Sequence, residues 1–238
     1  MAALAENLAR VNAQISEAAA TSGREATEIE LVAVSKTHPA ERVQEIFDAG
    51  HRLFGESRVQ EAREKIPRLP GGAHWHFIGH LQKNKIRHAL PLFELFHGID
   101  SMETAQNVDR IADELGLFPK ILIEVNVAGE SSKFGFSAEH LRTQFEALME
   151  LPRVEIHGLM TIAPLAEEAE ASRPFFSHLR ELRDELQAAH SVALPHLSMG
   201  MTNDYRVAVE EGATLVRVGT AIFGARSGRG FARTPDAL

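Results

Sequence analysis

A lysine ends an apolar run in the segment LVAVSKTHP, residues 31–39. Alternate residues of a strand share a face, so Val32, Val34 and Lys36 lie on one side if this run is extended. If Val32 and Val34 point into a barrel, Lys36 reaches the mouth at the strand's C-terminal end, where barrels hold their active sites. Loss of hydration there disfavours a charged amine, and a neutral amine is a nucleophile toward carbonyls. The alternative is that Lys36 extends into solvent.

Two loops far along the chain have the composition of an anion-binding cup. One runs from Ser198 through Met199 to Gly200, and the other begins with Gly219 and Thr220. Small residues let an anion approach backbone N–H groups, and the two hydroxyls can add donors. Barrels often bind phosphate with the loops after strands seven and eight. Both loops also fit ordinary turns and caps, but with the lysine they predict a phosphorylated carbonyl ligand held as a Schiff base.

Arg217 stands in an apolar strand pattern and shares its face with Leu215 and Gly219. An unpaired guanidinium in such a place is unfavourable. Either Arg217 pairs with a barrel carboxylate such as Glu124, or it donates to a ligand atom that accepts a hydrogen bond. Arginine remains protonated, so a pyridine nitrogen opposite it would stay unprotonated, and the ligand would be a weak electron sink.

Short apolar runs alternate with amphipathic stretches, and these elements must position the candidate residues. The predicted strands are 31–35, 52–55, 74–79, 95–99, 120–127, 154–162, 195–199 and 214–218. The predicted helices lie near 40–49, 57–66, 82–90, 103–115, 138–149, 168–190 and 203–211. Residues 2–22 predict one more, amphipathic, helix at the N-terminus, and the tail 227–238 is expected to be frayed. The order predicts an α/β fold, a (β/α)8 TIM barrel with an additional N-terminal helix; a doubly wound open sheet is the alternative.

Composition narrows the class of protein. The chain has 238 residues, of which 44% are hydrophobic and 24% charged, so we expect one globular domain spanning 1–238. The net charge of -8 argues against a broad nucleic-acid-binding surface. The absence of cysteine excludes disulfides, thiolate metal sites and cysteine nucleophiles, and it fits a reducing compartment. No apolar run approaches the ~18 residues of a membrane span, so we expect no membrane association and a cytoplasmic location.

The candidate residues fall in segments that resemble the pyridoxal phosphate homeostasis family, single-domain relatives of the alanine racemase barrel. The segments are AVSKTHP (33–39), FGESRVQEAREK (54–65), WHFIGHLQKNK (75–85), HGLMTIAP (157–164), LSMGMTNDY (197–205) and VRVGTAIFGAR (216–226). The resemblance implies that the cofactor is pyridoxal 5'-phosphate, that Lys36 carries it as an aldimine and that Arg217 faces the ring nitrogen. It implies a cofactor site completed by Val34, Ser57, Ser198, Met199, Gly200, Gly219 and Thr220. The family usually has asparagine where this chain has Ser57, so a water is expected to bridge from the shorter side chain.

The resemblance leaves a choice between an enzyme and a carrier. A racemase needs an acid or base on each face of the substrate α-carbon. Related racemases supply a tyrosine from a second domain, whereas the one tyrosine here is Tyr205, in the 197–205 segment. We therefore expect a monomeric carrier, active in intracellular cofactor homeostasis, that binds pyridoxal phosphate reversibly and passes it to dependent apoenzymes. The alternatives are an amino-acid racemase or related fold-type III enzyme, and a lysine aldolase acting on a sugar phosphate.

Other polar residues give weaker signals. His74, His76 and His80 suggest a metal site, but no carboxylate has a spacing that completes one, so we expect none. The alternative for His80 is a place near the cofactor mouth. The basic run at 83–87 predicts a solvated helix face, with an anion-attracting rim as the alternative. Lys133 follows the fifth predicted strand, from where a second amine could receive a bound aldehyde by imine exchange.

Overall fold

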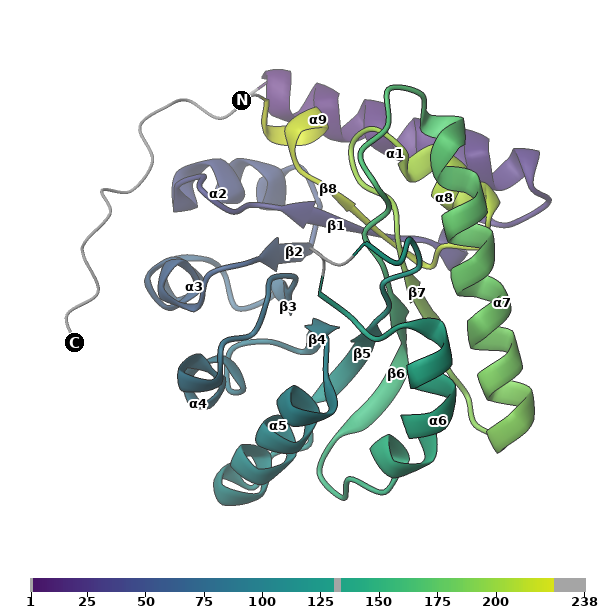
Figure 1. Ribbon diagram of the computed structural model, residues 1–238. Helices are drawn as coiled ribbons and strands as arrows, with labels where there is room; N and C mark the ends of the chain where they lie inside the picture. The colour runs from purple at the N-terminus through teal and green to yellow at the C-terminus, as the bar shows by residue number, and fades with distance from the viewer. Residues whose placement is uncertain (1, 131–133, 225–238) are drawn as a thin grey trace.

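The computed structural model describes residues 2–130 and 134–224, which contain eight parallel strands closed into a barrel (Figure 1). Each strand pairs with the next in the sequence, and β1 closes the barrel against β8. The strands are β1 (Glu30–Val34), β2 (Leu53–Glu56), β3 (His74–Phe77), β4 (Leu95–Ile99), β5 (Lys120–Glu124), β6 (Glu155–Met160), β7 (His196–Ser198) and β8 (Leu215–Val218). The (β/α)8 barrel is therefore confirmed, and the open sheet is excluded.

Helices surround the barrel, and those between α1 and α9 return the chain from the end of one strand to the start of the next (Figure 1). They are α1 (Ala2–Thr21), α2 (Ala40–Asp48), α3 (Val59–Lys65), α4 (Ile86–Ala89), α5 (Met102–Leu115), α6 (Ala138–Met149), α7 (Arg173–His190), α8 (Tyr205–Glu210) and α9 (Thr220–Phe223). Sequence-specific caps fix two of them, because Ser101 and Ser137 accept the backbone N–H groups of Thr104 and His140 at the starts of α5 and α6. Within the described residues, no helix combines the length and apolar character needed to cross a membrane.

The additional N-terminal helix covers the barrel where its last and first strands meet. One face of α1 is buried against α8, α9 and α2, through Leu4, Leu8, Val11, Ile15, Ala18 and Ala19. The 3–4 spacing of these residues gives the apolar stripe expected of an amphipathic helix. Asn7 also donates to the Ile222 carbonyl of α9 at 3.0 Å, so α1 braces the last turn of the described chain.

The strands separate two apolar regions. The larger region lies between the strands and the helices and contains the fully buried side chains of Phe54 and Phe96 from the strands and of Phe145 and Phe176 from the helices. A smaller cluster fills the barrel interior: Val32, Leu95, Leu122, Met160 and Leu215. Because alternate strand residues share a face, Val32 and Leu215 fix Val34 and Arg217 on the inward side of β1 and β8. The inward-facing residues of β1 and β8 therefore lead toward the mouth at the C-terminal ends of the strands.

Candidate functional site

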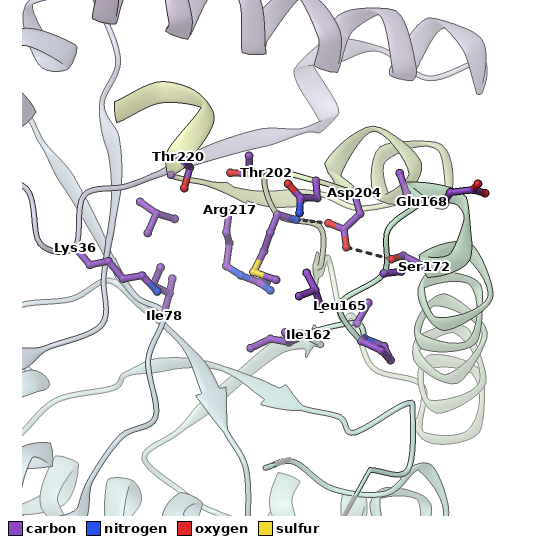
Figure 2. Close-up of a pocket in the computed structure, with 18 residues that line it drawn as sticks. Lys36, Ile78, Ile162, Leu165, Glu168, Ser172, Thr202, Asp204, Arg217 and Thr220 are labelled. Atoms are coloured by element: carbon purple, nitrogen blue, oxygen red, sulfur yellow. Dashed lines mark hydrogen bonds between the residues drawn. The ribbon is translucent and has the colours of Figure 1, made fainter. Parts of the chain in front are cut away.

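A cavity of about 630 Å³ opens at the C-terminal ends of the strands (Figure 2). Its wall contains five of the nine residues predicted to bind the cofactor: Val34, Lys36, Arg217, Gly219 and Thr220. The loop after β6 contributes the apolar side chains Ile162 and Leu165, and the loop after β7 contributes Thr202 and Asn203. The amine, the guanidinium and the two glycine-bearing loops therefore meet around one hollow, although 181 residues separate Lys36 from Arg217 in sequence.

Lys36 stands in the turn that follows β1, two residues beyond the strand end. Val32 belongs to the interior cluster and Val34 lines the cavity, so the alternation of β1 continues to Lys36. Figure 2 shows the Lys36 side chain extending into the cavity toward Ile78. The prediction that this lysine enters the barrel mouth is confirmed.

A buried ionic network holds the turn that carries Lys36. Lys65 Nζ donates to the Ser35 carbonyl at 2.9 Å and pairs with Glu56, whose Oε1 also accepts the Ser35 hydroxyl at 2.7 Å. Glu61 Oε2 accepts the backbone N–H of Thr37 at 2.8 Å. That bond helps to hold Thr37 at a φ of 67°, a left-handed conformation that costs a non-glycine residue about 1–3 kcal/mol.

Glu56, Glu61 and Lys65 were not among the site residues predicted from the sequence. Glu61 and Lys65 are four residues apart on α3, an ordinary spacing for an exposed helix pair. Here both are buried, at 6% and 4% exposure, behind the lysine turn. Their role becomes visible only when α3 is folded against the end of β1.

Of the residues predicted to form the anion-binding cup, some line the cavity and others are buried behind its wall. Gly219 and Thr220 reach the cavity wall, where Thr220 begins α9. Ser198 and Met199 are fully buried, and Met199 packs in the outer core. The Gly200 carbonyl accepts the Arg217 N–H at 3.0 Å, which ties the β7 loop to β8. The wall on this side is formed by Met201, Thr202 and Asn203 instead.

Asp204 fixes the loop that carries these three residues. Its carboxylate accepts the Met201 backbone N–H at 2.7 Å and the Ser172 hydroxyl at 3.2 Å. Both bonds are drawn in Figure 2. The β7 loop is thus fastened to the segment that leads into α7.

Gly200 is required by the packing of this loop. It has a φ of 88°, and a Cβ there would lie 2.5 Å from the Ala208 Cβ and 2.9 Å from the Tyr205 Cα. We expect Gly200→Ala to lower the free energy of unfolding by about 2–4 kcal/mol, because left-handed strain adds to overpacking. Chemical denaturation measures this change.

Gly116→Ala is the matched control for that substitution. Gly116 has a φ of 67° but open space around its position, so only the backbone strain of about 1–2 kcal/mol applies. Equal costs for the two variants would show that Gly200 is not crowded by α8.

Ser57 is not among the residues that line the cavity. A Cβ on Gly79 would lie within 2.9 Å of the Ser57 Cα and Cβ, so these two residues pack together just past the ends of β2 and β3. The contact keeps the two neighbouring loops close. The predicted role of Ser57 beside a cofactor remains a prediction.

Arg217 is 5% exposed, yet it lines the cavity. One guanidinium nitrogen donates to the Ser198 hydroxyl, and the other donates to the Thr161 carbonyl at 2.9 Å. Burial lowers the pKa of Arg217 to about 10, and Glu124 and Asp204 oppose that effect, so the group is still charged at pH 7. Burial also raises the pKa of Glu124 to about 7. The predicted alternative partner, Glu124, therefore acts on Arg217 through its field, while the guanidinium donates its hydrogen bonds to Ser198 and Thr161.

The histidines considered as metal ligands have separate partners. His74 contacts Glu94 at 2.8 Å and His80 contacts Asp100 at 2.9 Å. His76 points inward to His97. Among residues 2–130 and 134–224, no cluster of three potential ligands is present.

The basic run at 83–87 is largely matched by acidic residues. Lys83 lies 3.5 Å from Glu103, and Arg87 pairs with Glu114, all on exposed surface. This favours the solvated helix face over an anion-attracting rim. Lys133 and the tail 227–238 lie outside the described residues.

The sequence is similar to one protein family over almost its whole length. Residues 2–227 match the family model described as alanine racemase, N-terminal domain. The pyridoxal phosphate homeostasis protein of Aquifex aeolicus is 46% identical over 222 residues, 93% of this chain and 97% of the relative. The protein of that name in Pseudomonas aeruginosa is 43% identical over 230 residues, covering 95% and 97%.

Solved structures of related proteins have the same barrel fold. PipY of Synechococcus elongatus, solved with pyridoxal phosphate bound, superposes with a TM-score of 0.81 at 40% identity and covers 93% of this chain and all of its own. Alanine racemase of Clostridium difficile superposes with a TM-score of 0.73 at 17% identity, over 98% of this chain and 59% of the racemase. The racemase therefore shares the barrel fold, whereas the first three relatives share most of the chain at family-level identity.

Proposed function

Because the chain belongs to the alanine racemase N-terminal domain family, alongside the pyridoxal phosphate homeostasis proteins, we propose that it binds pyridoxal 5'-phosphate reversibly and serves homeostasis of that cofactor. The observation that carries the proposal is the meeting of Lys36, Arg217 and the Gly219–Thr220 loop in one cavity. These groups match the three functional parts of the cofactor: aldehyde, ring nitrogen and phosphate.

The donor set fits this ligand. A cavity of about 630 Å³ lies within the usual size of small-molecule sites. A Cβ on Gly219 would approach the Val34 Cβ to 3.3 Å, so glycine lets this loop pack closely against β1 at the cavity wall. Thr220 adds a hydroxyl beside that backbone. The buried guanidinium supplies hydrogen-bond donors only, which suits an unprotonated ring nitrogen.

The residues of the chain divide the work of holding the cofactor. Lys36 would hold the cofactor through its aldehyde carbon, with a water molecule released on binding and a water molecule consumed on release. Gly219 and Thr220 would hold the phosphate, with residues 201–203 lining the other side of the cup. Arg217 would donate to the ring nitrogen and disfavour its protonation, which would weaken the electron sink that amino-acid chemistry requires.

A carrier fits these residues better than a racemase does. The hydroxyl of Tyr205, the one tyrosine in the sequence, donates to Gln14 of α1 on the outer side of the barrel. Tyr205 is therefore unsuited to serve as the acid or base opposite Lys36. Exposed apolar side chains at the mouth, Ile162, Leu165 and Met201, leave the site open to exchange with solvent or a recipient.

The proposal is tested by an absorbance spectrum of the purified protein loaded with pyridoxal phosphate. We expect the absorbance of a protein-bound imine, and we expect hydroxylamine to remove it. Incubation with L- and D-amino acids should give no turnover above that of free cofactor. Rapid racemisation would overturn the carrier in favour of an enzyme, and a colourless protein that cleaves sugar phosphates would favour the aldolase.

We further propose that the carrier works as a cytoplasmic monomer and transfers its cofactor to pyridoxal phosphate-dependent apoenzymes. The lack of cysteine is consistent with a reducing compartment. Transfer is measurable as activation of an apoenzyme by the loaded protein under conditions in which free pyridoxal phosphate is trapped. Light scattering gives the mass in solution.

A further inference from the structure

A chain of polar side chains crosses the barrel interior beneath Arg217. His76 of β3 faces His97 of β4, with 3.0 Å between His76 Nδ1 and His97 Nε2. His97 Nδ1 lies 2.8 Å from the Ser198 hydroxyl of β7, which in turn accepts from Arg217 of β8. All four side chains are at most 7% exposed. The chain connects the cavity wall to the centre of an otherwise apolar barrel.

The donors and acceptors of these groups allow only one direction of donation along the hydrogen-bond chain. Arginine has no acceptor, so the Ser198 oxygen must accept from Arg217. If Ser198 donates its own proton to His97 Nδ1, then His97 carries a proton on Nε2 and donates it to His76 Nδ1. In the opposite arrangement, the buried Ser198 proton has no acceptor among its described contacts, an arrangement that is unfavourable. The satisfied direction runs from Arg217 through Ser198 and His97 to His76.

Both histidines suit this arrangement because they are neutral. Burial lowers the pKa of His97 well below its usual value, with His76 and Arg217 adding to the effect. Burial lowers the pKa of His76 to about 3, with His196 and His74 adding to it. A neutral imidazole has one donor and one acceptor, which is the pair that a one-way chain requires.

We propose that Ser198, His97 and His76 form a one-way hydrogen-bond chain that positions Arg217 as the donor to the cofactor's ring nitrogen. The proposal rests on the function proposed above. It gives Ser198 a role other than phosphate binding. The Ser198 oxygen accepts a hydrogen bond from the guanidinium, and the Ser198 hydroxyl donates one to His97. His97 is a positioning residue, since it acts on the cofactor through Ser198 and Arg217. Without His97, the Ser198 hydroxyl has no acceptor for its hydrogen bond, and Arg217 is then free to move away from the ring nitrogen.

The first measurement uses the ligand-free protein. Nitrogen-15 NMR of the histidine rings at pH 7 should find His97 and His76 neutral, each with its proton on Nε2. A proton on Nδ1 of His97, or a charged ring, would overturn the direction of the chain. This result does not depend on whether the protein binds pyridoxal phosphate.

The second measurement uses protein loaded with pyridoxal phosphate labelled with nitrogen-15 in the ring, whose chemical shift separates pyridine from pyridinium. His97→Leu should shift this signal toward the protonated form and weaken retention about tenfold, the loss expected for one buried hydrogen bond of a charged group. Ser198→Ala should act in the same direction, and it provides a second variant if His97→Leu does not fold.

Two matched variants separate positioning from general damage. His97→Asn places an amide oxygen near the position of Nδ1, so it should keep the Ser198 acceptor and the wild-type ring signal. His51→Leu removes a histidine that is likewise kept neutral by burial but bonds the Leu53 carbonyl, so it should leave the signal unchanged. A folded His97→Leu variant with the wild-type ring signal and affinity would overturn the proposal. Failure of the wild-type protein to bind pyridoxal phosphate would overturn the proposed function, and the tuning role with it, before any variant is compared.

Discussion

Lys36→Ala is expected to remove the imine absorbance completely while leaving the barrel folded. Lys36 extends into the cavity from a turn, and its truncation would leave the network of Ser35, Thr37 and Lys65 in place, because that network contacts backbone atoms and the Ser35 hydroxyl. The phosphate cup and Arg217 remain, so weak non-covalent binding should persist. Loss of the covalent bond should weaken retention by on the order of 100-fold or more, equivalent to about 2.7 kcal/mol.

Spectroscopy and equilibrium dialysis measure the two parts of this prediction. Lys36→Arg is an informative companion, because it keeps a positive charge in the cavity but cannot form the imine. Lys120→Ala serves as the control, since Lys120 is exposed at the start of β5, at the opposite end of the strands. A coloured Lys36→Ala protein would show that another amine holds the aldehyde.

Lys65→Met is expected to cause the largest loss of stability. Lys65 is 4% exposed and Glu56 is fully buried, so the substitution leaves a buried carboxylate without its cation. Removing one partner of such a pair costs about 3–5 kcal/mol. The turn that carries Lys36 also loses the donor to the Ser35 carbonyl, so retention of the cofactor should fall as well. Urea denaturation of the ligand-free variant measures the stability.

The pH dependence of this variant identifies the cause. Burial already raises the pKa of Glu56, while Lys65 and Ser35 oppose that effect. Without Lys65 the folded-state pKa rises further above the unfolded value, and the folded protein then gains stability by binding a proton. The cost of Lys65→Met should therefore be greatest at high pH, where Glu56 is ionised, and shrink as the pH falls through the raised pKa of Glu56. A cost that is the same at every pH would point to lost packing instead.

A surface pair provides the scale for comparison. Arg142 and Glu185 form a bidentate pair, but both side chains are substantially exposed. Arg142→Met should cost at most about 1 kcal/mol, because solvent screens such pairs. A Lys65→Met cost no greater than this would show that the buried network does not stabilise the turn.

The sequence was sufficient for the barrel and for the inward direction of its two key cations. Each strand is a short apolar run with a helix pattern behind it, and the period of two carries Val32 to Lys36 and Leu215 to Arg217. The sequence pattern predicted no element after the eighth strand, and there the structure adds the short helix α9. That helix is too short to give a periodic signal of its own.

The depth of each residue along the barrel axis was not predictable in this way. Ser198 pairs in register with Leu215, one inward-facing residue before Arg217, so it lies level with the interior cluster rather than with the cavity. The offset between neighbouring strands sets this level, and it is not written in either strand alone. For the same reason, the contact of Ser198 with His97 of β4, and of His97 with His76 of β3, could not be identified from a single sequence.

The central claim is that Lys36 and the cup formed by the loops after β7 and β8 hold one and the same ligand. Borohydride reduction of the protein loaded with pyridoxal phosphate, followed by peptide mapping, tests it most directly. The label should appear on the peptide containing Lys36, and added inorganic phosphate should compete with the labelling. A label concentrated on any other lysine, Lys133 included, or labelling of Lys36 that phosphate does not affect, would contradict the claim.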